Sequence, residues 1–279
     1  MGKSIRRFLA AALVLAPTVV PADDWLFDGT VGLIGYDNVG RSRYPADHRS
    51  ETALELDAAA RRQPGWQTPG VFEFEIWAGL DRYDRFPDLN QVRAGVGASY
   101  YDRVGLGPTS PWWSLFARLG YHDYGSQLRD GPVWQWGVAG GRRWAEKVDL
   151  TGRIAFRRQR AASNVFSTST VRVSADLDYR ITPRWGTFGG LAWQRGDLSS
   201  ALLSPGNAGP VWVDDPAFGA GWRSYRVDAD VVALGVGVTA NIGQTTQLLL
   251  AWERLDGRAR DFSADYDGSI YKVQLTHEF

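Results

Sequence analysis

The sequence contains no cysteine, which excludes disulfide bonds as a source of stability. Lysine is scarce too: Lys3, Lys147 and Lys272 are the only lysines among 31 basic residues, so arginine carries almost all of the positive charge. The 31 basic residues are matched by 31 acidic ones, which leaves no excess positive charge to attract nucleic acid. Zinc-ligand spacing, a phosphate-binding glycine loop and a dinucleotide fingerprint are also missing, so we expect no metal, no cofactor and no nucleic-acid partner.

Long apolar runs are missing from residue 23 onward, where none reaches the 18 or so residues of a membrane-spanning helix. The N-terminus does have a shorter run. The positive head KSIRR precedes the apolar segment Phe8–Val20, and the small residues of VPA precede a cleavage site before Asp23. This pattern predicts a secretory signal peptide over residues 1–22 and a mature domain over 23–279. The apolar segment is too short to be a membrane anchor, which needs roughly 20 residues.

The rest of the chain alternates between apolar and polar residues with a period of two, as in VRVSADLDYRI at 171–181. The expected strands exceed the roughly 5–6 residues usual in soluble sheets, and about 9–11 residues cross the hydrocarbon of a bilayer. We expect strands near 25–37, 52–62, 71–84, 91–103, 112–124, 133–145, 149–160, 169–181, 186–197, 225–242, 246–257 and 268–279.

Short connections alternate with longer polar ones along the chain, and the segment 198–224 is the longest. This asymmetry is typical of an outer-membrane barrel. We therefore predict an all-β fold, a single transmembrane up-and-down antiparallel β-barrel of 12 strands, with 10 and 14 strands as alternatives. An even count places both termini on the short-turn side, in the periplasm. The strands of a soluble β-sandwich also alternate between apolar and polar residues. Here, however, the polar positions carry charge in the middle of the strands, which fits a water-filled lumen better. Five tryptophans at or beside the short turns predict an interfacial girdle: Trp66, Trp112, Trp113, Trp144 and Trp185.

The chain ends with SIYKVQLTHEF, an alternating strand that finishes on an aromatic residue. A signal peptide, long alternating strands and this ending resemble bacterial outer-membrane β-barrel proteins, whose last strand is read by their assembly machinery. The resemblance implies that Tyr271, Val273, Leu275 and Phe279 form the assembly signal, although His277 stands where an apolar residue is commoner. It also implies outer-membrane lipids, lipopolysaccharide and the barrel-assembly machinery as partners. We expect this strand to pair with the first one, WLFDGTVGLIGY.

The polar side chains that alternate with the apolar ones are expected to line the lumen. They form an acidic sector on the second and third strands, beside a basic sector on the strands that follow. An open bore of this kind favours anionic solutes, because guanidinium groups suit carboxylates and phosphates. The predicted pore-lining residues are the basic Arg93, Arg118, Arg143, Arg153, Arg157, Arg172 and Arg180 and the acidic Glu55, Asp57, Glu73, Glu75, Asp81, Asp176 and Asp178.

Whether this lumen is open depends on how the charges pair, since a network of salt bridges could equally fill it. Small inward residues favour an open pore, among them Gly95, Gly97, Ser99, Gly137, Ala139 and Ala155. The arginine-lined lumen is similar to that of 12-stranded porins for acidic oligosaccharides. The segment GLIGYDNV looks like the first strand of barrels linked to surface-polymer export. Trp212, Phe218 and Trp222 in the longest loop could form a constriction, a cap or a partner surface, or could pack within the loop itself.

These observations give three functional hypotheses. The first is a channel for small, anionic solutes or oligosaccharides. The second is a non-catalytic accessory barrel in surface-polymer export, assembly or adhesion. The third is a lipid hydrolase, for which His122 is the best candidate base, but Asp123 beside it should point to the opposite face of the strand. We therefore expect no enzyme and no catalytic residues.

Overall fold

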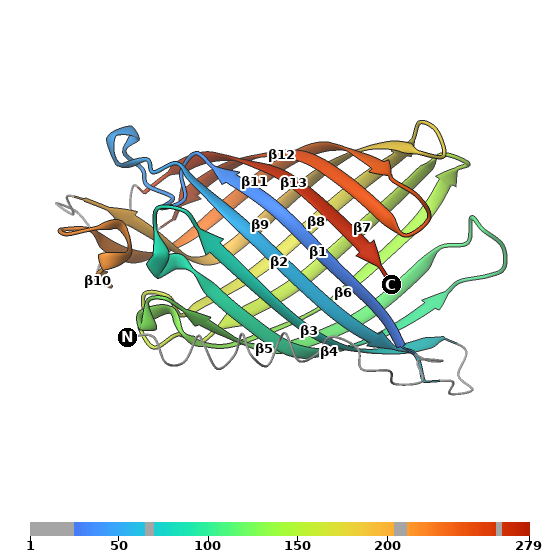
Figure 1. The fold of residues 1–279 in the computed structure, drawn as a ribbon, viewed down its shortest axis with the longest axis horizontal. Coiled ribbons are helices and arrows are strands. Elements are labelled where there is room, and N and C mark those ends of the chain that lie inside the picture. The colour runs from blue at the N-terminus through green and yellow to red at the C-terminus, as the bar shows by residue number, and fades with distance from the viewer. Residues whose placement is uncertain (1–24, 65–69, 204–210, 261–263) are drawn as a thin grey trace.

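The computed structural model describes residues 25–64, 70–203, 211–260 and 264–279. The predicted signal peptide and Trp66 lie outside this part of the chain. Twelve long strands form a closed antiparallel ring in which each strand pairs with its neighbours along the chain and β13 pairs with β1 (Figure 1). The ring strands are β1 (Trp25–Tyr36), β2 (Glu51–Arg62), β3 (Val71–Tyr83), β4 (Gln91–Arg103), β5 (Trp112–Tyr124), β6 (Gly131–Ala145), β7 (Val148–Gln159), β8 (Thr168–Arg180), β9 (Trp185–Leu202), β11 (Arg223–Asn241), β12 (Thr246–Ala259) and β13 (Tyr266–Glu278).

The predicted twelve-stranded barrel is therefore confirmed. A thirteenth strand, β10 (Trp212–Asp214), pairs only with β11 and stands outside the ring. No α-helix occurs in the described residues, and no helix there is long and apolar enough to cross a membrane. Four 3-10 helices lie in the connections: η1 (Pro45–Asp47), η2 (Pro87–Leu89), η3 (Gln127–Arg129) and η4 (Pro216–Phe218).

The two parities of each strand face different environments. On β8, Val171, Val173 and Leu177 point outward with 37–47% of their surface exposed, which is the pattern of a wall that faces lipid. On β13, Tyr271 and Val273 likewise point outward. The alternate positions carry the polar and charged side chains that line the interior cavities. The barrel therefore has its apolar side chains on the outer face, as expected from the sequence.

The two ends of the barrel differ. One end, here called the turn end, carries the shortest connections, such as residues 146–147, and the chain's last residue (Figure 1, right). The other, the loop end, carries the two longest connections, residues 37–50 and 203–222, together with all four 3-10 helices and β10 (Figure 1, left). At the loop end β9 continues to Leu202 and pairs with β11 as far as Arg223, although the sequence pattern predicted a loop from 198 to 224. Leu198, Leu202 and Tyr225 are buried there, and this packing explains why the ladder continues.

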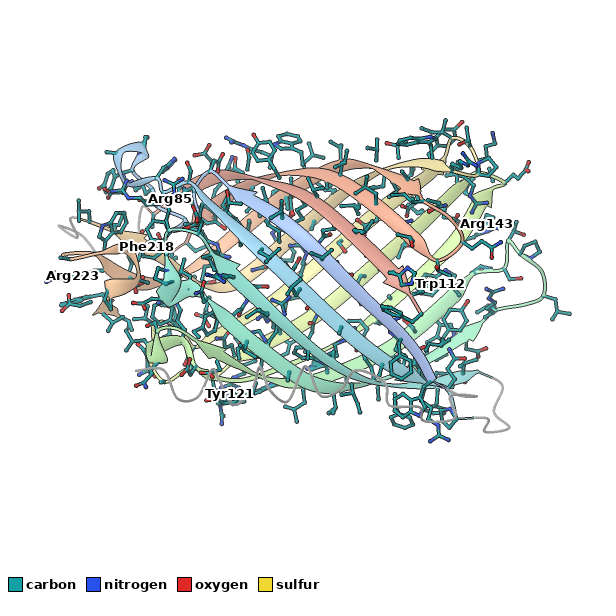
Figure 2. All side chains as sticks on the ribbon, in the orientation of Figure 1. Arg85, Trp112, Tyr121, Arg143, Phe218 and Arg223 are labelled. Atoms are coloured by element: carbon teal, nitrogen blue, oxygen red, sulfur yellow. The ribbon has the colours of Figure 1, made fainter. Side chains whose placement is uncertain are left out.

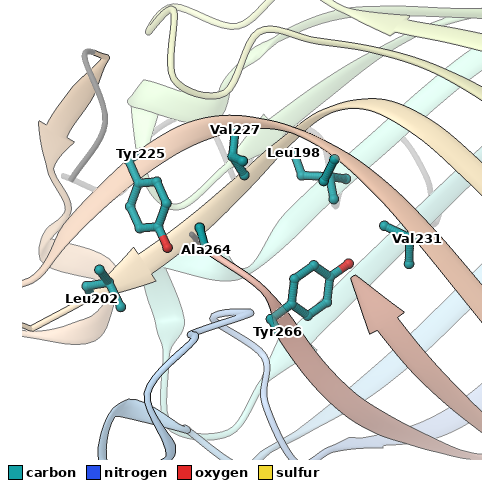
Figure 3. Close-up of a cluster of buried hydrophobic side chains, with 8 residues drawn as sticks. Leu198, Leu202, Tyr225, Val227, Val231, Ala264 and Tyr266 are labelled. Atoms are coloured by element: carbon teal, nitrogen blue, oxygen red, sulfur yellow. The ribbon is translucent and has the colours of Figure 1, made fainter. Parts of the chain in front are cut away.

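A cap of packed loops covers the loop end. Its first apolar cluster combines inward residues of β9 and β11 with Ala264, just before β13, and Tyr266, the first residue of β13 (Figure 3). Its second cluster includes Leu89, Phe218 and Trp222 from two different loops. Each cluster brings together segments that are far apart in the sequence, so the cap is a tertiary structure rather than a set of separate loops.

Candidate functional site

The lumen wall formed by β2, β3 and β4 holds a dense ion-pair network centred on Arg93. Its Nη2 atom lies 2.7 Å from Asp57 Oδ1 and 3.0 Å from Glu55 Oε1, and its Nη1 atom lies 2.5 Å from Asp81 Oδ2. The barrel register explains these contacts, because Asp57, Gly79 and Arg93 share one rung across the three strands. Since Gly79 has no side chain, the arginine passes over it to reach Asp57. A Cβ atom at Gly79 would lie 2.3 Å from Asp57 Oδ1 and 2.5 Å from Arg93 Nε.

The same arrangement repeats toward the turn end. Glu75, Gly97 and Arg118 share a rung across β3, β4 and β5, and Arg118 Nη2 reaches Glu75 Oε2 at 2.8 Å over the glycine. Arg61 on β2 lies 2.9 Å from Asp28 and 3.5 Å from Glu75. The acidic residues lie on β2 and β3 and the basic ones on β4 and β5, and in this half of the wall the two sectors pair with each other, which is the salt-bridged alternative left open by the sequence. Two arginines assigned to the basic sector reach back across a single strand, because a glycine on that strand leaves the path open.

The opposite half of the wall, on β7 and β8, carries arginines without close carboxylate partners. Arg153 lies over the ring of Phe116, with its guanidinium carbon 4.4 Å from the ring centroid. Arg172 approaches Glu253 only to 3.8 Å. Among the described residues, Arg157 has no ion pair and no hydrogen bond within the usual distances. Arg153 and Arg172 line a cavity of about 330 Å³ together with Asp176, Gln135, Ser174 and Glu253.

The remaining predicted lumen residues lie nearer the turn end. Arg143 pairs with Asp149 at 3.1 Å, and Figure 2 shows Arg143 at the turn end of the barrel. Glu73 accepts a hydrogen bond from Gln63 at 3.2 Å. Arg180 and Asp178 occupy the last turn-end rungs of β8.

The small inward residues do not leave the space that the sequence suggested. The ring of Trp77 lies over Gly95, where a Cβ atom would be 2.6 Å from it, and the ring of Phe116 lies over Gly137 in the same way at 2.7 Å. These glycines accommodate aromatic rings, as glycines in curved sheets often do. The expectation that they favour an open bore is therefore wrong for these two positions. Trp112 also differs from its predicted place in the girdle, because it packs on inward Tyr101 and over Gly141.

A buried ion pair fastens the cap. The two guanidinium nitrogens of Arg129 donate to the two carboxylate oxygens of Asp215 at 3.1 and 2.5 Å, and the Asp215 side chain is fully buried. Ser224 Oγ also donates to Asp215, at 2.5 Å. Nearby, burial raises the pKa of the Asp130 carboxyl, although that carboxyl accepts a hydrogen bond from the Tyr124 backbone. Nothing in the sequence pattern singled out Arg129 or Asp215, because each lies in a loop and its partner is remote in the chain.

The cap crosses the mouth of the barrel. The connection between β3 and β4 and the connection between β9 and β11 lie on opposite sides of the ring, with four strands between them in either direction. Phe86 of the first nevertheless lies 5.3 Å from Phe218 of the second, measured between ring centroids. Phe218 also lies beside Trp222, 5.4 Å away. Among the alternatives left open by the sequence, Phe218 and Trp222 therefore form part of a cap, and Figure 2 shows Phe218 at the loop end. Trp212 remains 46% exposed, and the guanidinium group of Arg223 lies over its ring.

The last strand closes the ring as expected. β13 pairs with β1 from Asp28 opposite Glu278 to Tyr36 opposite Ile270. The Phe279 backbone N–H donates to Phe27 at 2.9 Å, and its side chain is 81% exposed. Leu275 points outward with Tyr271 and Val273, so the four residues of the predicted assembly signal lie on the outer surface or at the turn-end rim.

His122 faces the lumen and is only 7% exposed. Its Nδ1 atom has no hydrogen-bond partner among the described residues. No hydrogen bond or ion pair joins it to a serine or a carboxylate within that part of the chain, and its ring neighbours are Trp77 and Tyr124. A lipid hydrolase would need its base on the outer wall, so the position of His122 gives no support to that hypothesis.

No protein-family model and no curated protein matches the sequence. Among solved structures, the COG4313 outer membrane channel from Pseudomonas putida F1 is similar with a TM-score of 0.57 and 11% identity, over 94% of this chain and all of that one. The NanC porin covers 88% of this chain and 98% of its own at a TM-score of 0.46 and 11% identity. The β domain of the Bordetella autotransporter BrkA is similar over 92% of this chain and 100% of its own, with a TM-score of 0.48 and 15% identity. The similarity to the Pseudomonas putida channel, at 11% identity, shows a shared fold, so the chain has the fold of an outer-membrane β-barrel, as the sequence resemblance predicted.

Proposed function

We propose that the barrel is an outer-membrane channel that passes small anionic solutes or oligosaccharides through its lumen. The observation that carries this proposal is the division of the arginines between the two halves of the wall. On β7 and β8, Arg153, Arg157 and Arg172 line the lumen with no carboxylate closer than 3.8 Å among the described residues. Arg153 and Arg157 have no ion pair in that part of the chain, and Arg172 has only the long contact with Glu253. Guanidinium groups of this kind in a narrow passage attract anions and repel cations.

The membrane context of the proposal follows from the barrel. We infer that the loop end faces the cell exterior and that both termini lie in the periplasm, because outer-membrane barrels have longer loops outside. The signal peptide would direct export, and Tyr271, Val273, Leu275 and Phe279 would be read by the barrel-assembly machinery. Lipopolysaccharide would surround the loop end.

Planar-bilayer recording tests the channel. The wild-type protein should conduct with a preference for anions, and Arg153→Glu combined with Arg172→Glu should reverse the preference by placing two negative charges on the same wall. The matched control is Arg195→Glu, because Arg195 is exposed and follows Trp193 on the outward parity of β9. A selectivity that is unchanged in the double variant, or changed equally in the control, would contradict the proposal.

The cap favours a second candidate, a closed accessory barrel. Loops that meet across the mouth leave no obvious exit at that end, and a permanently closed barrel would serve as a scaffold or partner surface. Asp215→Asn distinguishes the two candidates, because it weakens the ion pair that fastens the cap to Arg129. A channel should show higher or more frequent conductance when the cap is loosened. Silence in both the wild type and Asp215→Asn would favour the accessory barrel.

A further inference from the structure

The underside of the cap presents an arginine that the sequence pattern did not identify. Arg41 lies in the connection between β1 and β2, and its side chain lines two interior cavities of about 640 and 270 Å³. Arg157 on β7 and Tyr124 on β5 line both of the same cavities. Arg41 on the cap and Arg157 on the wall therefore share two cavities, which places two like charges around the same space.

The backbone of Arg41 is held in an unfavourable conformation. Its φ angle is 52°, and it is the one non-glycine residue in the described part of the chain with a positive φ. Hydrogen bonds hold it there from two sides: its own N–H donates to Asn38 at 3.1 Å, and Ser200 Oγ donates to its carbonyl at 2.7 Å. The adjacent Gly40 carbonyl accepts from Ala201 at 2.9 Å. Strain of this kind persists only where the surroundings impose it, and it concentrates at functional positions.

Carboxylates line both cavities, but they have partners of their own. In the smaller cavity Asp197 accepts a hydrogen bond from the Ser169 N–H at 3.1 Å and lies 3.8 Å from Arg226. In the larger cavity Asp57 and Asp81 pair with Arg93.

Among the described residues, no carboxylate forms an ion pair with Arg41 or Arg157, whereas Arg93 next to them has three. The nearby His122 is nine-tenths buried, lines the larger cavity and has a ring nitrogen without a partner in the described chain. Two like charges and an unsatisfied polar atom around one cavity are costly unless a ligand completes them.

We propose that Arg41 and Arg157 form a binding site for a small oxyanion, a carboxylate or a phosphate, between the cap and the barrel wall. The smaller cavity adds Thr168, Thr170 and Gln194, whose hydroxyl and amide groups suit a hydroxylated ligand. Binding there links a loop to the wall, so an anion at this site also holds the cap down. The inference rests on the proposed function and specifies where its solute is recognised.

Titration calorimetry on the whole protein in detergent tests this site without requiring conduction. The probes are glucuronate and inorganic phosphate, which carry the two candidate oxyanions, with glucose as the neutral counterpart. At least one anion should bind the wild type, and glucose should bind far more weakly. Arg157→Gln and Arg41→Asn should each weaken anion binding by about tenfold or more, because each removes a charge-assisted donor. Asparagine is chosen at position 41 because it tolerates a positive φ.

Two further variants separate recognition from folding and from general lumen charge. Arg41→Gly should weaken anion binding as much as Arg41→Asn does while leaving the thermal unfolding temperature unchanged or raised, because glycine relieves the backbone strain. Arg143→Gln removes a lumen arginine at the turn end that is already paired with Asp149, and it should bind like the wild type. Binding of neither anion, or equal losses in Arg143→Gln and Arg157→Gln, would overturn the site. An anion-selective channel whose binding does not depend on Arg41 and Arg157 would retain the proposed function and remove only this inference.

Discussion

Arginine has different surroundings on the two halves of the lumen wall. On β2 to β5, Arg93 and Arg118 cross a glycine to reach acidic groups at hydrogen-bonding distance. On β7 and β8, Arg153 and Arg157 face the lumen without an ion pair among the described residues. The comparison shows that an arginine-rich lumen is not uniformly an anion surface. One half holds arginine in ion pairs, and the other leaves Arg153 and Arg157 without one in the described chain.

Arg93→Gln should have the largest effect on stability. It would leave Glu55, Asp57 and Asp81 close together without a cation, and removal of one partner of a buried charge cluster costs about 3–5 kcal/mol. Equilibrium unfolding in urea, with the barrel in lipid vesicles, measures the loss. Adding Asp57→Asn to the variant should recover part of it. Equal stability of the wild type and Arg93→Gln would mean that the network is not structural.

Gly79→Ala should have an intermediate effect, because it blocks the path between Arg93 and Asp57. A methyl group there would meet both side chains at 2.3 and 2.5 Å, and overpacking of this kind costs about 1–3 kcal/mol. The matched control is Gly235→Ala, on the inward parity of β11, where the nearest atom to a new Cβ is 3.8 Å away. The same unfolding assay should show a loss for Gly79→Ala alone. Similar losses for both variants would show that Gly79 is needed for strand packing instead.

Arg153→Gln should have the smallest effect, within about 0.5 kcal/mol of the wild type. It removes a cation that has no close carboxylate, so only its contact with Phe116 is lost. Unfolding measured beside Arg93→Gln gives the comparison directly. A loss as large as that of Arg93→Gln would erase the distinction between the two halves of the wall.

The barrel was predictable because membrane strands repeat one simple pattern over the whole chain. The parity of residues 171–181, the strand count and the pairing of the last strand with the first all follow from that alternation. The inward position of Arg93 follows too, but its partners depend on the register between strands, which alternation alone leaves open. Arg41 could not be predicted, because its place over the lumen depends on Ser200 and Ala201, more than 150 residues away.

The contact between Phe86 and Phe218 has a mechanical consequence. A tube of hydrogen-bonded strands deforms most easily by flattening from a circle to an ellipse, and a strut across its diameter resists that change. The loop rim has such a strut, reinforced by the buried bond between Arg129 and Asp215. At the turn rim, the ion pair of Arg143 with Asp149 and the packing of Trp112 on Tyr101 join neighbouring strands, and no strut across the bore is found among the described residues. Breathing of the tube should therefore grow from the braced rim toward the rim where the chain ends.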